Sequence, residues 1–136
     1  MAKVPGFLIV GDSSDEYGIQ RLCEMLSELG IVRVVGQDGL AERLEEHAYD
    51  AVILDAGAVS PVAAVVAEIL NRNPSTEVYV ITASPHWRVA RDVLQAGATD
   101  YMPKSRLSED LVASLRNIAQ RPARPEESAG VKGRGS

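Results

Sequence analysis

Short runs of apolar residues alternate along the chain with stretches in which apolar residues recur every three or four positions. The runs, the last of them half polar, lie at residues 7–10, 31–35, 51–54, 78–81 and 99–102. Such runs are typical of buried β-strands, whereas the spacing of three and four is typical of amphipathic helices. Strand and helix alternate in this way five times, without an internal repeat. The alternation predicts a parallel sheet with crossover helices.

A helix is predicted after each strand. The first covers residues 19–29 with Gly30 as its stop signal, and a shorter second one covers residues 40–47. Ser108 is expected to cap the fifth helix. The apolar positions that this last helix turns inward are Leu111, Val112, Leu115 and Ile118.

Two Ser-Pro pairs are predicted to open the third and fourth helices. Ser60-Pro61 and Ser84-Pro85 would each place a hydroxyl at the N-cap and a proline at the first helical position. Gly97 is expected to end the fourth helix, because glycine is common just past a helix C-terminus.

Polar interruptions indicate where each strand lies in the sheet. A strand that is paired on both sides and covered on both faces is a continuous apolar run, whereas an edge strand tolerates polar residues. Arg33 interrupts the second run and Asp100 the fifth, while the other three are continuous. With strands numbered in chain order, the order 2-1-3-4-5 places the second and fifth at the edges with right-handed crossovers. The predicted fold class is α/β, a doubly wound five-stranded parallel sheet.

Composition agrees with a single small domain. The chain has 136 residues, 46% of them hydrophobic, which is enough for one core. Its one cysteine, Cys23, excludes an internal disulfide and is expected to be a core residue. No apolar stretch approaches the ~18 residues of a membrane span, and no signal-peptide pattern opens the chain. A cytoplasmic protein is therefore expected.

Charge is unevenly distributed. Residues 1–120 hold 10 basic and 17 acidic groups, a net charge of −7, while residues 121–136 hold 4 basic and 2 acidic groups. An acidic body is a poor surface for nucleic acid, so we expect neither nucleic-acid nor membrane binding by this chain. Residues 121–136 are rich in Pro, Gly and charge, which predicts a disordered tail or linker after a domain at 1–120.

Four polar residues, Asp12, Asp55, Thr82 and Lys104, stand where predicted strands end. Parallel strands of an open sheet bring their carboxyl ends to one edge, where such folds bind ligands. Two neighbouring carboxylates repel unless a cation offsets their charge, and oxygen ligands that leave room for water suit Mg²⁺. The sequence therefore predicts two carboxylates, a hydroxyl and an ammonium around one site.

Such a site suits phosphoryl transfer. The Asp55 carboxylate could act as a nucleophile toward phosphorus and form an acyl phosphate. Mg²⁺, the Thr82 hydroxyl, the Lys104 ammonium and the backbone N–H groups that follow Asp55 and Thr82 would stabilise the transferred group. Ala83 is small, which would leave its N–H accessible to a phosphoryl oxygen.

Four segments of the chain, at residues 8–12, 49–55, 80–83 and 96–104, resemble the bacterial response-regulator receiver domain, the phosphoacceptor half of two-component signalling. Each segment alone is a weak signal, but the four in this order over about residues 6–120 are specific. The resemblance implies a flavodoxin-like receiver fold, Mg²⁺ as cofactor and a sensor histidine kinase as phosphoryl donor.

The resemblance also implies a role for each site residue. Asp55 is the phosphoacceptor, and Tyr101 is the aromatic switch. The Mg²⁺ ligands are Asp12, Asp55 and the carbonyl of Gly57, and the phosphoryl group contacts Thr82, Ala83 and Lys104.

The implied output is a face made of the fourth helix, the fifth strand and the fifth helix. This face would control a partner protein or output domain, and homodimerisation is one way to do so. Residues 30–36 and the pair Lys104-Ser105 resemble the subfamily that precedes a helix-turn-helix output domain in transcription regulators. The 136 residues do not include that domain, so any DNA binding is expected of residues outside them.

The chain departs from the receiver pattern at two places. Gly11 replaces the first of two adjacent acids, so we expect weaker metal binding. Residues 56–61 replace the usual loop after the phosphoacceptor with small residues, which predicts a flexible loop. Asp15 or Glu16 would restore the missing charge, although acids at a helix start are also favoured by the helix dipole.

Plainer interpretations remain open for single residues. Asp12 and Asp55 could be strand-end turn residues, and Tyr101 could serve packing alone. His47 and His86 are expected at the surface of helices. Trp87 is interpreted either as a partner contact or as a partial lid.

Two other functions are also open. One is a phosphorylation-independent pseudo-receiver that acts as a protein-interaction module, which Gly11 and the altered loop favour. The other is a small phosphohydrolase with an Asp nucleophile, but such enzymes commonly need a second acid two residues after the nucleophile, where Gly57 stands. We therefore expect a signalling protein and not an enzyme.

Overall fold

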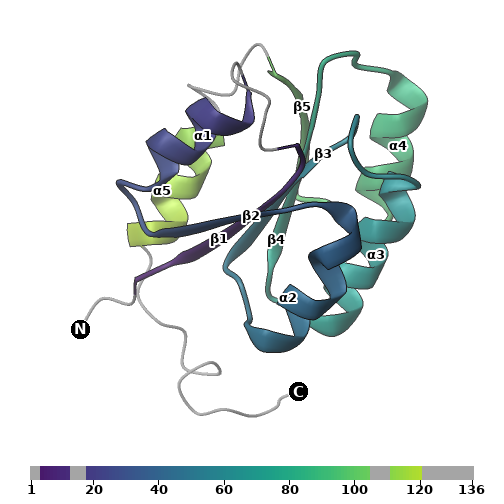
Figure 1. The fold of residues 1–136 in the computed structure, drawn as a ribbon. Helices are drawn as coiled ribbons and strands as arrows, with labels where there is room; N and C mark the ends of the chain where they lie inside the picture. The colour runs from purple at the N-terminus through teal and green to yellow at the C-terminus, as the bar shows by residue number, and fades with distance from the viewer. Residues whose placement is uncertain (1–3, 13–17, 105–110, 121–136) are drawn as a thin grey trace.

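The computed structural model describes residues 4–12, 18–104 and 111–120 of the chain. Ser108, Asp15 and Glu16, as well as the expected tail at 121–136, lie outside these residues. Strands and helices alternate along the described chain (Figure 1). The strands are β1 Gly6–Val10, β2 Ile31–Val35, β3 Ala51–Asp55, β4 Glu77–Thr82 and β5 Asp100–Pro103. The helices are α1 Ile19–Leu26, α2 Leu40–Glu46, α3 Val62–Arg72, α4 Trp87–Gln95 and α5 Val112–Gln120, with a short 3₁₀ helix, η1, at Gln37–Gly39.

The sheet is parallel throughout and has the order β2-β1-β3-β4-β5, which confirms the predicted fold class and strand order. Burial explains this order. Every residue of β3 is buried, as are all but the first residues of β1 and β4, whereas β2 and β5 keep exposed positions. Arg33 and Asp100, the polar residues that pointed to the edges, are both exposed there.

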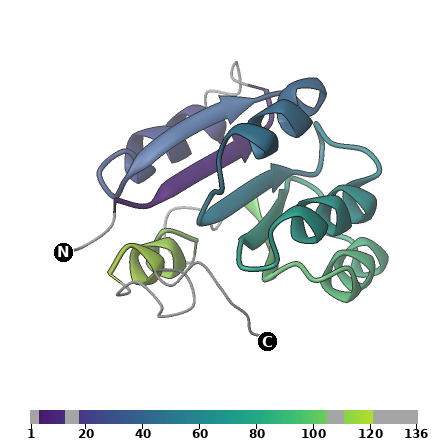
Figure 2. The same cartoon turned by 90° about the horizontal axis from the view of Figure 1, so that it is seen from below.

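Alternate side chains of each strand enter two separate cores, one on each face of the sheet. On one face, Phe7 and Ile9 of β1 pack with residues of α1 and α5. On the other face, Leu8 and Val10 pack with residues of α2, α3 and α4. Two views at right angles show the resulting three layers (Figure 1 and Figure 2). Because successive side chains of a strand point to opposite faces, a fully apolar strand supplies both cores.

The first helix is shorter than predicted, because α1 ends at Leu26 and not at residue 29. A tight turn follows, in which the N–H of Leu29 and the N–H of Gly30 both donate to the carbonyl of Leu26. A Cβ at position 30 would lie 2.3 Å from the carbonyl oxygen of Pro5. Glycine is therefore needed here for a close backbone approach between two chain segments.

The two Ser-Pro pairs do not cap helices as predicted. In α3, Pro61 itself stands at the N-cap and makes no capping bond from its side chain. In α4, the N-cap is His86, whose Nδ1 accepts a hydrogen bond of 3.1 Å from the N–H of Arg88. The predictions for Ser60 and Ser84 as caps were therefore wrong, and both helices start later than expected.

Gly97 ends the fourth helix as predicted. Its φ is 112°, a left-handed conformation that residues with a side chain rarely adopt. The N–H of Gly97 donates to the carbonyl of Leu94, and the N–H of Ala98 donates to the carbonyl of Val93. These bonds satisfy carbonyls of the last turn and direct the chain into β5.

Cys23 is half-buried on α1 and packs against the core below α1 and α5. Burial, and secondarily the negative charge of Glu24, raise the pKa of its thiol. Within the described ranges, none of the helices is both long and apolar enough to cross a membrane.

Candidate functional site

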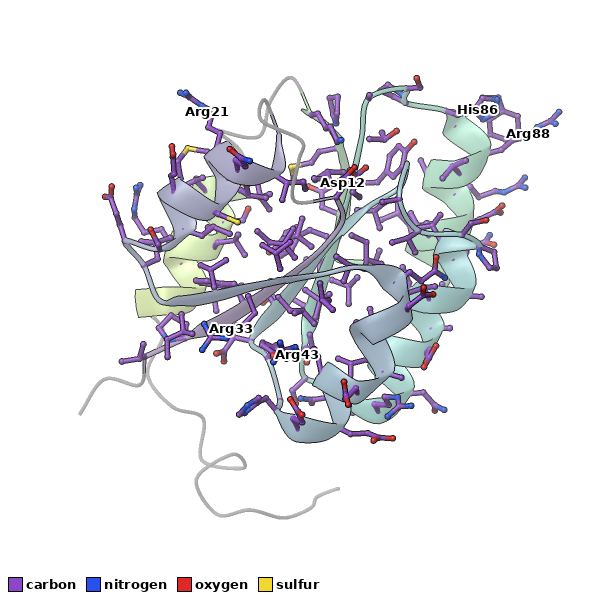
Figure 3. The ribbon with its side chains drawn as sticks, in the orientation of Figure 1. Asp12, Arg21, Arg33, Arg43, His86 and Arg88 are labelled. Atoms are coloured by element: carbon purple, nitrogen blue, oxygen red, sulfur yellow. The ribbon has the colours of Figure 1, made fainter. Side chains whose placement is uncertain are left out.

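A cleft at the carboxyl edge of the sheet is lined by all four residues that the sequence placed at strand ends. Asp12 follows β1, Asp55 ends β3, Thr82 ends β4 and Lys104 follows β5. The parallel register brings these strand ends together, with Asp55 beside Ile81. Figure 3 shows Asp12 at this end of the sheet. The cleft also contains the three other predicted site residues, which are Gly57, Ala83 and Tyr101.

Asp55 is the centre of the cleft and is almost fully buried, with an exposed fraction of 5%. Its Oδ2 lies 2.8 Å from the Nζ of Lys104, and its Oδ1 accepts a hydrogen bond of 3.0 Å from the N–H of Gly57. A buried carboxylate is stable only when it is paired and hydrogen-bonded. Lys104 and Gly57 together meet this condition in the state that the structure shows.

Thr82 is buried beside this pair, with an exposed fraction of 6%. Its Oγ1 accepts a hydrogen bond of 3.0 Å from the N–H of Ser84, which shapes the turn after β4. Ala83, between them, is exposed on the cleft. The turn therefore presents a small residue next to the buried hydroxyl.

Tyr101 joins the cleft to the start of α4. Its hydroxyl accepts a hydrogen bond of 3.1 Å from the N–H of His86, the N-cap of that helix. The Tyr101 ring is half-buried and also packs against the core below α2, α3 and α4. Tyr101 therefore packs against the core and also contacts the start of α4, and its role as a switch stays a prediction.

Trp87 lies at the surface of α4, with an exposed fraction of 63%, and is not among the residues that line the cleft. Its ring stacks against His86, and the guanidinium carbons of Arg88 and Arg91 lie 5.3 Å from its centroid. Figure 3 shows His86 and Arg88 pointing away from the sheet. This position suits a surface contact and not a lid.

Gly11, where the resemblance leads one to expect an acid, lies directly beside Asp55. A Cβ on Gly11 would lie 3.2 Å from the Cβ of Asp55 and 3.2 Å from the Cδ1 of Ile19. Ile19 is fully buried in the core, so it has little room to move away from such a group. The space for an additional carboxylate is therefore small, and the residues named as substitutes for it, Asp15 and Glu16, lie outside the described part of the chain.

The donor set of the cleft fits a divalent cation that keeps most of its water. The carboxylates of Asp12 and Asp55 and the carbonyl of Gly57 are oxygen ligands, and Mg²⁺ usually takes one or two carboxylates and several waters. Within the described residues there is no group of three or more His, Cys, Asp or Glu side chains that could hold a metal. The donor set therefore suits a cation that takes few protein ligands and keeps several waters.

One residue of the cleft, Gln37, was missed by the sequence analysis. It lies on the cleft, and its side-chain amide binds the backbone of Ser60 in the loop after β3. The two residues are 23 positions apart. A lone glutamine after an edge strand carries no local signal for such a contact, and Ser60 was predicted as a helix cap and as part of the altered loop.

Comparison with known proteins places the fold. No family model matches the chain, and no curated protein sequence matches it. Solved structures do match. The signal receiver domain of an HD domain-containing protein from Pseudomonas fluorescens is 24% identical, with a TM-score of 0.75 over 88% of this chain and 90% of that chain.

Two further similar structures were determined with a phosphoryl group or a BeF3 group present. The BeF3-activated DrrB receiver domain is 24% identical, with a TM-score of 0.71 over 88% of this chain and all of that chain. A response regulator from Burkholderia pseudomallei with a phosphorylated aspartic acid and a calcium ion is 19% identical, with a TM-score of 0.72 over 93% of this chain and 72% of that chain. The chain therefore has the fold of response-regulator receiver domains. Its expected place in the subfamily with helix-turn-helix output stays a prediction.

Proposed function

We propose that this chain, with its receiver fold, is a phosphorylation switch in which a sensor histidine kinase transfers a phosphoryl group to Asp55. The observation that carries the proposal is the environment of Asp55, a buried carboxylate 2.8 Å from the Lys104 ammonium in a cleft shared with Asp12 and Thr82. Two of the similar structures support it by their descriptions, one with a phosphorylated aspartic acid and one activated by BeF3.

In the proposed reaction, a carboxylate oxygen of Asp55 attacks the phosphorus of a phosphohistidine. The new P–O bond forms as the P–N bond breaks, and the imidazole leaves with the electron pair and takes a proton from solvent. Lys104, already 2.8 Å from Oδ2, needs only a small movement to neutralise the phosphoryl oxygens. Asp12 and the Gly57 carbonyl would hold Mg²⁺, which when bound supplies further positive charge at these oxygens.

The phosphoryl group would then change the contacts of two neighbouring residues. The Thr82 hydroxyl, now an acceptor for the N–H of Ser84, would donate to a phosphoryl oxygen. Tyr101 would repack inward and lose its bond to the N–H of His86. This would alter the start of α4 and shift the partner affinity of the face formed by α4, β5 and α5.

The test is covalent labelling. Wild-type protein incubated with acetyl phosphate and Mg²⁺ should gain one phosphoryl mass, and Asp55→Asn should gain none, because an amide is not a nucleophile toward phosphorus. Asp92→Asn is the matched control, since Asp92 is exposed on α4, and it should label like the wild type. Equal labelling of Asp55→Asn and wild type, measured by intact mass spectrometry, would refute the acceptor.

A pseudo-receiver is the second candidate, and specific observations favour it. Gly11 leaves the cleft without the additional acid, and both oxygens of Asp55 already have donors from the chain itself. A pseudo-receiver would form no stable acyl phosphate. In that case the wild-type protein and Asp55→Asn would bind the partner with equal affinity. The phosphorylation switch predicts instead that only the wild type changes its affinity after treatment with acetyl phosphate.

The remaining parts of the proposal concern context. We propose that the protein acts in the cytoplasm, that it controls an output domain or partner protein in transcription regulation, and that it does so with or without homodimerisation. We also propose that it is not a phosphohydrolase, because Gly57 stands where such an enzyme commonly needs its second acid. Rapid turnover of phosphomonoesters by the purified protein would refute this.

A further inference from the structure

The side chain of Gln37 binds both backbone groups of Ser60. Its Nε2 donates to the carbonyl oxygen of Ser60 at 2.8 Å, and its Oε1 accepts from the N–H of Ser60 at 3.0 Å. We call these two hydrogen bonds the Gln37 clasp. Gln37 begins η1, just after β2, whereas Ser60 lies in the loop between β3 and α3. Because β1 lies between β2 and β3, the clasp spans the carboxyl end of β1, where Asp12 lies.

The loop that the clasp holds is fixed mainly by its backbone, since the N–H of Ala56 donates to the carbonyl of Ile81 and few of its side chains are large enough to pack. Ala56, Gly57 and Ala58 offer almost no side-chain surface for packing, and Gly57 and Ala58 are exposed. Val59 is buried and anchors the loop to the core. A loop of small residues has many conformations in the unfolded chain, so the two bonds at Ser60 help to hold it in one of them.

The same loop touches the acceptor carboxylate. The N–H of Gly57 donates to Oδ1 of Asp55 at 3.0 Å, and the N–H of Ala58 donates to the carbonyl of Asp55 at 2.9 Å. Gln37 itself lines the cleft together with Asp55 and Gly57. Gln37 is therefore linked to the carboxylate by its bonds to Ser60, by the short chain segment from Ser60 back to Gly57, and by the bond from the Gly57 N–H to Asp55.

We propose that Gln37 is a positioning residue for Asp55, which fixes the N–H and carbonyl of Gly57 relative to the carboxylate through the Gln37 clasp. This inference rests on the proposed phosphoacceptor function of Asp55. The clasp adds to the packing of Val59 in holding the loop in register with the cleft. Gln37 does not touch the reacting atoms, so it acts only through the loop.

The experiment compares three variants with the wild type in the rate of labelling by acetyl phosphate at saturating Mg²⁺. Gln37→Ala removes both bonds and should slow labelling about tenfold, less than the roughly hundredfold loss that a misplacement of about 1 Å can cause. Gln37→Glu keeps the acceptor for the N–H of Ser60 but loses the donor, and it should recover part of the rate. Gln95→Ala, at an exposed position of α4, is the control and should label at the wild-type rate.

A second measurement separates positioning from general stability. The backbone amide signal of Gly57 in a ¹⁵N–¹H correlation spectrum should shift in Gln37→Ala and stay in place in Gln95→Ala. The melting temperature of each variant is recorded alongside. If Gln37→Ala does not fold, the labelling rate and the Gly57 amide signal are both measured on Gln37→Glu instead.

Wild-type labelling rates in Gln37→Ala, an unmoved Gly57 amide, or an equal rate loss in Gln95→Ala would each overturn the inference. If the wild type itself takes no phosphoryl group, the proposed function fails. The position of the Gly57 amide signal in Gln37→Ala then tests the effect of the clasp on the loop without any labelling. A shifted amide supports the positioning of the loop, and an unmoved one refutes it.

Discussion

Asp55 shows at the scale of one residue how a carboxylate can be buried and still available for chemistry. Lys104 and the N–H of Gly57 each contact one of its oxygens. Removing one partner of a buried ion pair typically costs about 3–5 kcal/mol, because the remaining charge is left uncompensated. A phosphoryl group on Asp55 would place its oxygens close to Lys104. The ammonium would therefore keep an anionic partner before and after transfer.

Gly11 allows a prediction about metal binding and stability. In Gly11→Asp we expect tighter Mg²⁺ binding, because a third carboxylate would lie beside Asp55 and Asp12. We also expect the free energy of unfolding to fall by about 1–3 kcal/mol, the usual cost of overpacking. The cause is that the new Cβ would lie 3.2 Å from both the Cβ of Asp55 and the Cδ1 of Ile19. Calorimetric Mg²⁺ titration and urea unfolding measure the two effects.

Gly36 and Ile19 provide the controls for this substitution. Gly36→Asp adds the same charge after β2, where a Cβ would meet nothing within 4 Å, and should change stability by less than about 0.5 kcal/mol. Ile19→Val shortens the side chain that opposes position 11. The combination of Gly11→Asp with Ile19→Val should therefore lose less stability than the sum of the single losses. Additive losses, or an unchanged Mg²⁺ titration, would contradict this account.

At the scale of the elements, the strands and the starts of α1 and α2 were predictable from the sequence, whereas the starts of α3 and α4 were not. The order of the strands follows from burial, since β1, β3 and β4 are covered on both faces and must be apolar. The starts of α3 and α4 depend instead on tertiary contacts. Gln37 holds the backbone of Ser60, and Tyr101 accepts from the N–H of His86. Local capping preference is weaker than such long-range bonds, so the two Ser-Pro pairs were misleading.

Gly97 yields a prediction for the end of α4. Gly97→Ala should lower the free energy of unfolding by about 1–3 kcal/mol, because alanine is strained at a φ of 112°. The added methyl group would also approach the Cδ1 of Leu70 to 2.6 Å, although this flexible side chain can move away. Gly36→Ala serves as the control. Urea unfolding that gives equal stabilities for Gly97→Ala and wild type would show that the turn tolerates another conformation.

At the scale of the whole molecule, the cleft is connected to the surface of α4 through Tyr101. Its hydroxyl accepts from the N–H of His86, and the next residue is Trp87, the single tryptophan of the chain. We therefore predict that Trp87 fluorescence changes when wild type is treated with acetyl phosphate and Mg²⁺. In Tyr101→Phe, which lacks the hydroxyl, the change should be at most about half as large.

Asp55→Asn is the negative control for this fluorescence measurement and should show no change. A full-sized response in Tyr101→Phe would mean that the signal reaches α4 by another route. If mass spectrometry shows that the wild type is phosphorylated but Trp87 fluorescence does not change, then α4 is not part of the switch.

The site was predictable where it depends on topology and unpredictable where it depends on single long-range contacts. Asp55 and Thr82 end their strands, and Asp12 and Lys104 follow theirs closely. A correct strand order was therefore enough to bring the four to one cleft. Gln37 reaches the cleft only through its amide bonds to Ser60. No periodicity or strand-end position marks such a residue in the sequence.

The wide separation of the cleft residues along the chain has a consequence for biosynthesis. Asp55 leaves the ribosome 49 residues before Lys104, the cation with which it pairs. Until β5 joins β4, the Asp55 carboxylate lacks this ammonium. Transfer of the unpaired carboxylate into the interior is unfavourable. We therefore expect a partly folded nascent chain to keep the charged form of Asp55 in water until β5 arrives.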